Sequence, residues 1–263
     1  MVPAGHGAAG SGATRLIRRR LHLPPERIGA TRAELTDQAR HYLRDVLRLL
    51  PGAAIELFDG RGGAWEAVIE PGFAALAVGA KREAVSAGPA LSLLFALAKG
   101  DKCELVVQKA TELGVARLCP WAAERSVLRL DAGKGLERAE RWRRIAEEAS
   151  RQCGRADVPL VEAPVGLAEA LAAVPAGHLL VVLHGPGGAP LAGLGLEGAP
   201  GVALLVGPEG GLTDGELAAC QAAGARRGSL GPRTLRAETA AIAGVAVLQA
   251  VVGDLGGAGQ APT

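Results

Sequence analysis

The chain has 263 residues, 49% of them hydrophobic, and a formal net charge of only +2. This length allows one large domain or two modest ones, and no uninterrupted apolar run approaches the ~18 residues of a membrane span. The first twelve residues lack the charged start and long apolar stretch of a signal peptide, so we expect a soluble, cytoplasmic protein.

Four cysteines stand at positions 103, 119, 153 and 220. No two of them have the C-x-x-C spacing, and no histidines accompany them at zinc-ligand spacing. We therefore expect buried, reduced thiols and no metal site.

Two segments are strongly basic although the whole chain is nearly neutral. Residues 14–48 hold nine Arg and four acidic residues, and residues 125–155 hold nine Lys or Arg and five acidic residues. Such clusters indicate a surface that faces a polyanion. Ordinary solvated helix faces would explain the composition equally well.

Residues 14–83 predict a small, mostly β module between a loose tail at 1–13 and a linker that contains Gly88 and Pro89. The segments 20–23 and 54–60 have strand character. A helix is expected over residues 31–49, with Leu35, Ala39 and Leu43 in its apolar stripe. Arg40, Arg44 and Arg48 recur every four residues on another face.

From residue 90 the pattern becomes α/β and continues to 253, before a second loose tail at 254–263. Short apolar runs at 91–97, 116–121, 178–184 and 202–207 are typical of parallel strands buried on both faces. Helices alternate with them, as βαβ units require. One is expected to begin at a capping box of Asp101 and Glu104. Another, over 136–152, brings Arg144 and Arg151 to one face with Arg155.

A glycine-rich turn follows the last of these runs. Gly207-Pro208-Glu209-Gly210-Gly211 links a predicted strand to a helix that begins with a capping box of Thr213 and Glu216. Ligands bind α/β proteins at such carboxyl edges of the sheet. The turn matches neither a Walker A loop nor the G-x-G-x-x-G fingerprint, and a βα corner that needs only a positive φ remains the alternative.

A second strand end lies at residues 229–231, and a long, almost wholly apolar helix follows it. Arg233, Arg236 and Glu238 stand between the two. A helix so apolar on all sides must be covered by protein, either in the core or at a dimer interface.

The runs GPEGGLTDGE and LGPRTLRAETA resemble the knotted (SPOUT) methyltransferases that make 3-methyluridine in 16S ribosomal RNA of the small subunit. The upstream blocks HYLRDVLRLLPGAAIELFDGRGG, KGDKCELVVQKATELGVARLCPWAAERSV and ERWRRIAEEASRQCGRADVP resemble that family in the same order. The resemblance covers residues 15–252. Cys153 departs from it, since such sequences usually have Ser at this position.

The resemblance implies an N-terminal PUA-like β-barrel that binds RNA and an α/β SPOUT domain, a deep trefoil-knotted parallel sheet flanked by helices. It also implies a homodimer, S-adenosylmethionine as cofactor, and 16S ribosomal RNA, within the small ribosomal subunit, as partner. The expected cofactor-binding residues are Leu183, His184, Gly185, Gly207, Pro208, Glu209, Gly210, Gly211, Leu230, Gly231 and Leu235.

Methylation of uracil N3 requires loss of the N3 proton, which leaves negative charge between two carbonyls. Arg236 is the candidate cation, with a phosphate clamp or a bond to Glu238 as alternatives. Glu238 is the candidate general base, although a Glu in the first turn of a helix commonly serves the helix dipole. Glu209 is a second candidate base, or it holds its own turn. His184 has a loop-structural role in this interpretation.

Eight residues of the two basic segments are the expected RNA contacts: Arg20, His41, Arg44, Arg48, Arg125, Arg144, Arg151 and Arg155. Three other functions stay open from the residues alone. They are a ribose 2′-O-methyltransferase, a non-catalytic RNA-binding protein, and an unrelated nucleotide-binding α/β enzyme.

Overall fold

The computed structural model describes residues 19–82, 89–126, 132–185 and 188–255. The predicted tail at 1–13 lies outside these residues, as do residues 256–263 of the second tail and the larger part of the predicted linker. None of the described helices is both long and apolar enough to cross a bilayer.

The N-terminal part is built on a five-stranded sheet of order β1-β3-β4-β5-β2, whose only parallel pair is β1 with β3. Leu21, Leu57, Ile69 and Leu76 are among the residues of its core. Its elements are β1 (Arg20–His22), η1 (Pro25–Arg27), β2 (Arg32–Glu34), α1 (Asp37–His41), η2 (Tyr42–Val46), β3 (Ala54–Phe58), β4 (Ala64–Ile69), η3 (Pro71–Phe73) and β5 (Ala75–Arg82).

The helix expected over residues 31–49 is wrong at its start and at its end. Residues 32–34 form β2 and pair with β5, and the helix begins only after Thr36, whose side chain accepts a hydrogen bond from the Ala39 amide at 3.1 Å. It then widens into the π-helical η2. Arg48 lies beyond it at φ +52°, so the three arginines do not form a continuous stripe.

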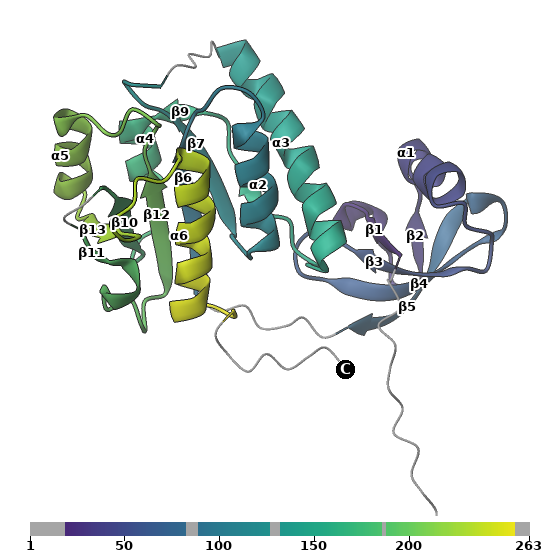
Figure 1. The fold of residues 1–263 in the computed structure, drawn as a ribbon. Coiled ribbons are helices and arrows are strands. Elements are labelled where there is room, and N and C mark those ends of the chain that lie inside the picture. Colours follow the sequence, from purple (N-terminus) through teal and green to yellow (C-terminus); the bar gives the residue numbers. More distant parts are fainter. Residues whose placement is uncertain (1–18, 83–88, 127–131, 186–187, 256–263) are drawn as a thin grey trace, which may run out of the picture.

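The C-terminal part is a parallel sheet of order β11-β13-β10-β12-β6-β7-β8, with β9 paired to β7 (Figure 1). Its strands are β6 (Ala90–Ala96), β7 (Arg117–Ala122), β8 (Leu160–Val161), β9 (Val165–Gly166), β10 (Leu179–Leu183), β11 (Ala189–Pro190), β12 (Gly201–Val206) and β13 (Arg226–Ser229). Its helices are α2 (Lys102–Glu112), α3 (Ala132–Cys153), α4 (Leu167–Ala172), η4 (Leu191–Gly193), α5 (Asp214–Ala222) and α6 (Ala237–Val251).

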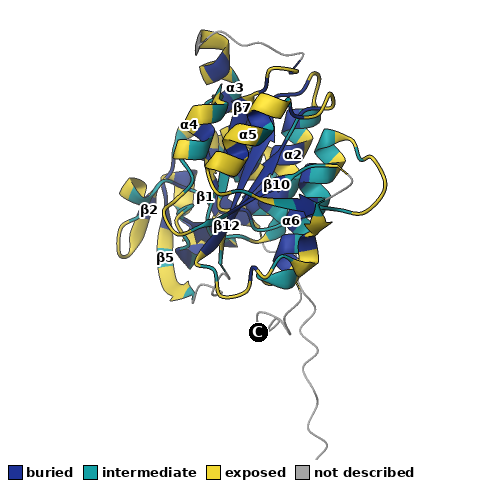
Figure 2. Cartoon of the chain, turned by 90° about the vertical axis from the view of Figure 1, so that its left-hand side faces the viewer, coloured by how far each residue is buried: buried dark blue, intermediate teal, exposed yellow. Residues whose placement is uncertain are grey.

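Helices cover both faces of this sheet, so its central strands are buried (Figure 2). Leu93 and Phe95 of β6 face α2, α3 and α6, whereas Leu94 faces the side of α4 and α5. This double burial explains the uninterrupted apolar runs in the sequence. The capping box of Thr213 and Glu216 is confirmed. The one expected at Asp101 is wrong, because its side chain makes no capping hydrogen bond.

The four cysteines are free thiols. Three are buried, and Cys153 at the end of α3 is half-buried. Burial raises the pKa of Cys119 to about 12 and that of Cys220 to about 11, so these thiols stay protonated and unreactive. The predicted buried, reduced thiols are confirmed at Cys103, Cys119 and Cys220.

The order of β10, β11 and β13 departs from their order in the sequence. Both β10 and β11 precede β13 in the chain, yet β13 lies between them and pairs with each in parallel. A later strand is thus inserted between two earlier ones, as expected for the SPOUT fold class.

Close backbone packing accompanies the insertion of β13. A Cβ atom on Gly188 would lie 2.8 Å from the carbonyl carbon of Gly228, so only glycine fits here. Arg226 of β13 also donates hydrogen bonds to the carbonyl oxygens of Leu194 (2.9 Å) and Gly195 (3.2 Å), which follow β11 in the chain.

We predict that Gly188→Ala lowers the free energy of unfolding by about 1–3 kcal/mol, the usual effect of overpacking. Gly193→Ala is the matched control, since a Cβ there meets no heavy atom within 4 Å. Thermal unfolding of both variants measures the difference. Equal melting temperatures would contradict the close packing at Gly188.

Candidate active site

Three loops meet at one edge of the parallel sheet. They follow β10, β12 and β13, which lie side by side in the sheet in the order β13-β10-β12. Because parallel strands end at the same edge, the segments 183–185, 207–212 and 230–235 are brought together from distant parts of the sequence. The arrangement groups the residues expected to hold the cofactor.

The glycine turn after β12 is held from both sides. Gly211 donates a backbone hydrogen bond to the Pro208 oxygen at 2.9 Å and has φ +72°, a conformation that favours glycine. The Arg125 guanidinium donates to the Gly210 oxygen at 3.0 Å. Glu216 accepts hydrogen bonds from the amides of Thr213 and Glu124, both at 2.8 Å. These hydrogen bonds fix the conformation of the turn at the edge of the sheet.

The first loop begins at Leu183 and His184. The His184 amide donates to the Gly228 oxygen at 3.2 Å, which places the loop directly against β13. The imidazole is half-buried, and Gly185 is exposed with open space where a side chain would project.

The third loop leads into α6, where the two candidate catalytic residues differ in their surroundings. Arg236 is the N-cap residue of α6 and its side chain is exposed. Glu238 lies in the first turn of α6 with its side chain only 12% exposed. Its Oε2 atom is buried and has no hydrogen-bond partner in the described part of the chain.

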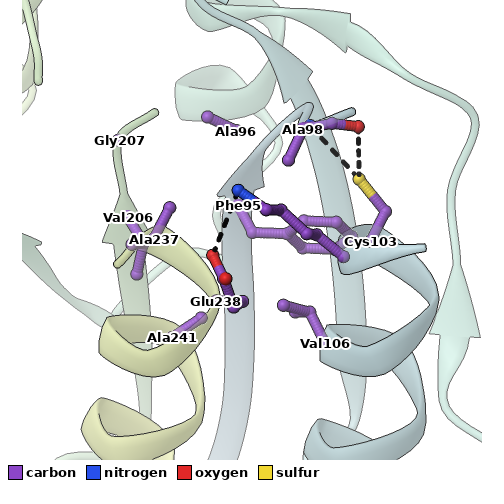
Figure 3. A pocket seen from close by; sticks show the side chains of 11 residues that line it. Phe95, Ala96, Ala98, Cys103, Val106, Val206, Gly207, Ala237, Glu238 and Ala241 are labelled. Carbon is purple, nitrogen blue, oxygen red and sulfur yellow. Dashed lines mark hydrogen bonds and ion pairs between the residues drawn. The ribbon is translucent and has the colours of Figure 1, made fainter. Parts of the chain in front are cut away.

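Glu238 projects into a small, mainly apolar pocket between α2 and α6 (Figure 3). The pocket is walled by residues such as Phe95 and Val206, at the carboxyl ends of β6 and β12, and Val106 of α2. A carboxylate in such surroundings is stabilised by a nearby cation.

That cation is Lys102, which the sequence interpretation did not single out. Its Nζ donates to Glu209 Oε1 at 2.5 Å and lies 3.8 Å from Glu238 Oε2. The hydrogen bond raises the pKa of Lys102 and lowers the pKa of Glu209. The only available signal was its place in the block KGDKCELVV.

Two of the residues expected to contact RNA, Arg20 and Arg155, direct their guanidinium groups to hydrogen-bond partners within the protein. Arg20 is only 7% exposed and donates to Glu56 Oε1 at 2.6 Å and to the carbonyl oxygens of Ser150 and Arg155. The Arg155 guanidinium donates to the carbonyl oxygens of Thr111 and Val115 and pairs with Asp157.

The remaining expected contacts fall into two groups. Arg125 is bonded to the glycine turn, and Arg151 stacks on the Tyr42 ring at 4.3 Å while pairing with Glu148. The others, His41, Arg44, Arg48 and Arg144, are exposed. Among them, His41 and Arg44 each contact Asp45. Because α3 ends at Cys153, Arg155 does not belong to the predicted common face with Arg144 and Arg151.

Comparison with known proteins assigns both parts of the chain. Residues 86–249 match the family model of an RNA methyltransferase domain. The chain belongs to this RNA methyltransferase family. Residues 35–72 match the model of the RNA methyltransferase PUA domain, as the N-terminal sheet leads one to expect.

Curated relatives of this RNA methyltransferase carry the name ribosomal RNA small subunit methyltransferase E. The protein from Synechocystis is 35% identical over 89% of this chain and 78% of its own length, and that from Mycobacterium tuberculosis is 33% identical over 74% and 78%. Among solved structures, a Legionella pneumophila methyltransferase with bound S-adenosylmethionine is 34% identical, covers 90% of this chain and 99% of its own, and has a TM-score of 0.80. The Neisseria gonorrhoeae methyltransferase E, also bound to S-adenosylmethionine, is 29% identical with the same coverage and a TM-score of 0.83.

We predict that Arg20→Met lowers the free energy of unfolding by about 2–4 kcal/mol, because buried acceptors lose their donor. The exposed Arg44→Met should change it far less, because a solvated ion pair such as Arg44 with Asp45 contributes little to stability. Urea unfolding followed by tryptophan fluorescence compares the two variants. Equal effects would show that the hydrogen bonds of Arg20 do not stabilise the contact between the N-terminal sheet and α3.

Proposed function

We propose that this RNA methyltransferase transfers the methyl group of S-adenosylmethionine to N3 of a uridine in 16S ribosomal RNA of the small subunit. The observation that carries the proposal is the convergence of three loops with Arg236 and Glu238 at one sheet edge. The names of the relatives, and the cofactor in two solved neighbours, support the same reaction.

The loop residues fit the cofactor. At Gly185, Gly211 and Gly231 an added Cβ would meet no heavy atom within 4 Å, so backbone groups face open space at all three loops. We infer that a ligand lies against them, held by Leu183, His184, Gly185, Gly207, Pro208, Glu209, Gly210, Gly211, Leu230, Gly231 and Leu235. The cofactor supplies a methyl group on a positively charged sulfur, which leaves as a neutral thioether and needs no acid.

The chain must then prepare the uracil. Glu238, buried in the pocket, is the base that takes the N3 proton. Arg236 stabilises the negative charge that develops on the flanking carbonyl oxygens. Its guanidinium is available, because in the described part of the chain no hydrogen bond or ion pair engages it. The uracil must be unstacked from the neighbouring nucleobases of the RNA before Glu238 and Arg236 can contact it.

The remaining assignments are part of the same proposal. Residues 14–83 form the RNA-binding module and residues 90–253 the methyltransferase domain, in a homodimer that acts in the cytoplasm on the small subunit. Ile242 and Ala246 of α6 are only half-buried in the single chain, which supports an interface on this helix. His41, Arg44, Arg48 and Arg144 are the exposed candidates for phosphate contacts.

The test of the reaction uses methyl-labelled S-adenosylmethionine with naked 16S RNA or with small subunits from cells that lack the enzyme. Digestion to nucleosides and mass spectrometry should detect labelled 3-methyluridine. Label on a ribose would replace the proposal with a 2′-O-methyltransferase. Absence of label together with absence of cofactor binding by calorimetry would indicate a non-catalytic RNA-binding protein.

We predict that Arg236→Ala keeps the melting temperature and cofactor affinity but loses more than about tenfold in turnover, or about 1.4 kcal/mol of barrier. Single-turnover methylation at saturating cofactor measures the rate. A smaller loss of turnover would contradict a catalytic role for Arg236.

A further inference from the structure

Lys102 and Glu238 line the pocket, Glu209 is bonded to Lys102, and Arg236 precedes Glu238 by two residues. Lys102 begins α2, Glu209 belongs to the glycine turn, and Arg236 and Glu238 begin α6. Lys102 is the member that bridges segments, since its Nζ reaches a carboxylate on each of the other two. Glu209 and Glu238 thus share the Lys102 ammonium group, and Arg236 has no carboxylate partner in the described part of the chain.

The second cation is within electrostatic reach of the same group. The charge of Arg236 contributes to the lowered pKa of Glu209 and opposes the raised pKa of Lys102. Arg236 is the extended N-cap residue of α6, and in the described part of the chain no ion pair joins it to Glu238. If Lys102 were absent, Glu209 would be the carboxylate that attracts Arg236.

We propose that Lys102 is a positioning residue of this reaction: by engaging Glu209 and facing Glu238, it keeps the Arg236 guanidinium free to meet the uracil. The inference rests on the proposed function, because it assumes that Arg236 acts on the base. Lys102 touches no reacting atom in this role. It prevents an ion pair between Arg236 and Glu209 that would hold the Arg236 guanidinium away from the uracil.

The variant Lys102→Met tests this role. It removes the charge and keeps a long apolar stem in the pocket wall. Turnover at saturating substrates should fall by about tenfold or more, because Arg236 turns to Glu209. Lys102→Arg should keep most of the activity, since a guanidinium can engage the same carboxylates. Lys109→Met is the matched control on the same helix, where the lysine pairs with Glu112 instead.

A double-mutant cycle separates positioning from simple bracing. In Lys102→Met/Glu209→Gln, the carboxylate that captures Arg236 is gone, so turnover should recover by about threefold or more over Lys102→Met alone, a coupling of ordinary size for neighbouring groups. Glu209→Gln alone completes the cycle. A double variant as slow as Lys102→Met, or slower, would overturn the proposal, as would a Lys102→Met enzyme as fast as wild type.

Failure of the underlying function has its own signature. If the wild-type protein forms no 3-methyluridine, or if Arg236→Ala is fully active, the proposed function or the assigned role of Arg236 fails whatever Lys102 does. Cofactor affinity by calorimetry and melting temperature are measured for every variant. A loss of turnover in Lys102→Met that follows loss of folding or of cofactor binding would also overturn the positioning role.

Discussion

The site depends on the pairing of β13 with β10, two strands that are distant in the sequence. Because β12 pairs with the other side of β10, the segment 230–235 after β13 lies beside the loops that follow β10 and β12. The close approach of Gly188 to Gly228 allows β11 to pack against the outer side of β13. This strand order assembles the edge at which Arg236 and Glu238 stand.

Charge is distributed unequally across that edge. Glu238 is nearly enclosed by apolar side chains, whereas Arg236 is exposed at the start of the same helix. Lys102 compensates the enclosed carboxylate from the neighbouring helix, and its stronger bond goes to Glu209 of the glycine turn. The two halves of the site, the turn and the start of α6, are thereby joined through a residue that belongs to neither.

Sequence reasoning succeeded where the cause was local. The buried strands follow from uninterrupted apolar runs, and the start of α5 follows from Thr213 and Glu216 three residues apart. It failed where a distant partner decides the outcome. Residues 32–34 become a strand because β5 pairs with them. Arg20 is buried against an acceptor, the Ser150 carbonyl oxygen, that lies 130 positions away in the sequence. Lys102 likewise pairs with Glu209, which is 107 positions away. The arrangement of the three loops expected to hold the cofactor came from family resemblance, because periodicity contains no information on the order of strands in a sheet.

The position of β13 also has a consequence for folding of the protein. Both β10 and β11 leave the ribosome before β13, and domains generally fold from the N-terminal side as they emerge. The strands β6, β7, β10 and β12 can therefore associate on the nascent chain. Because β13 pairs with both β10 and β11, the sheet is completed between those two strands only after β13 has been synthesised. Arg236 and Glu238, which follow β13 in the chain, join the site after the strands that precede them have been made.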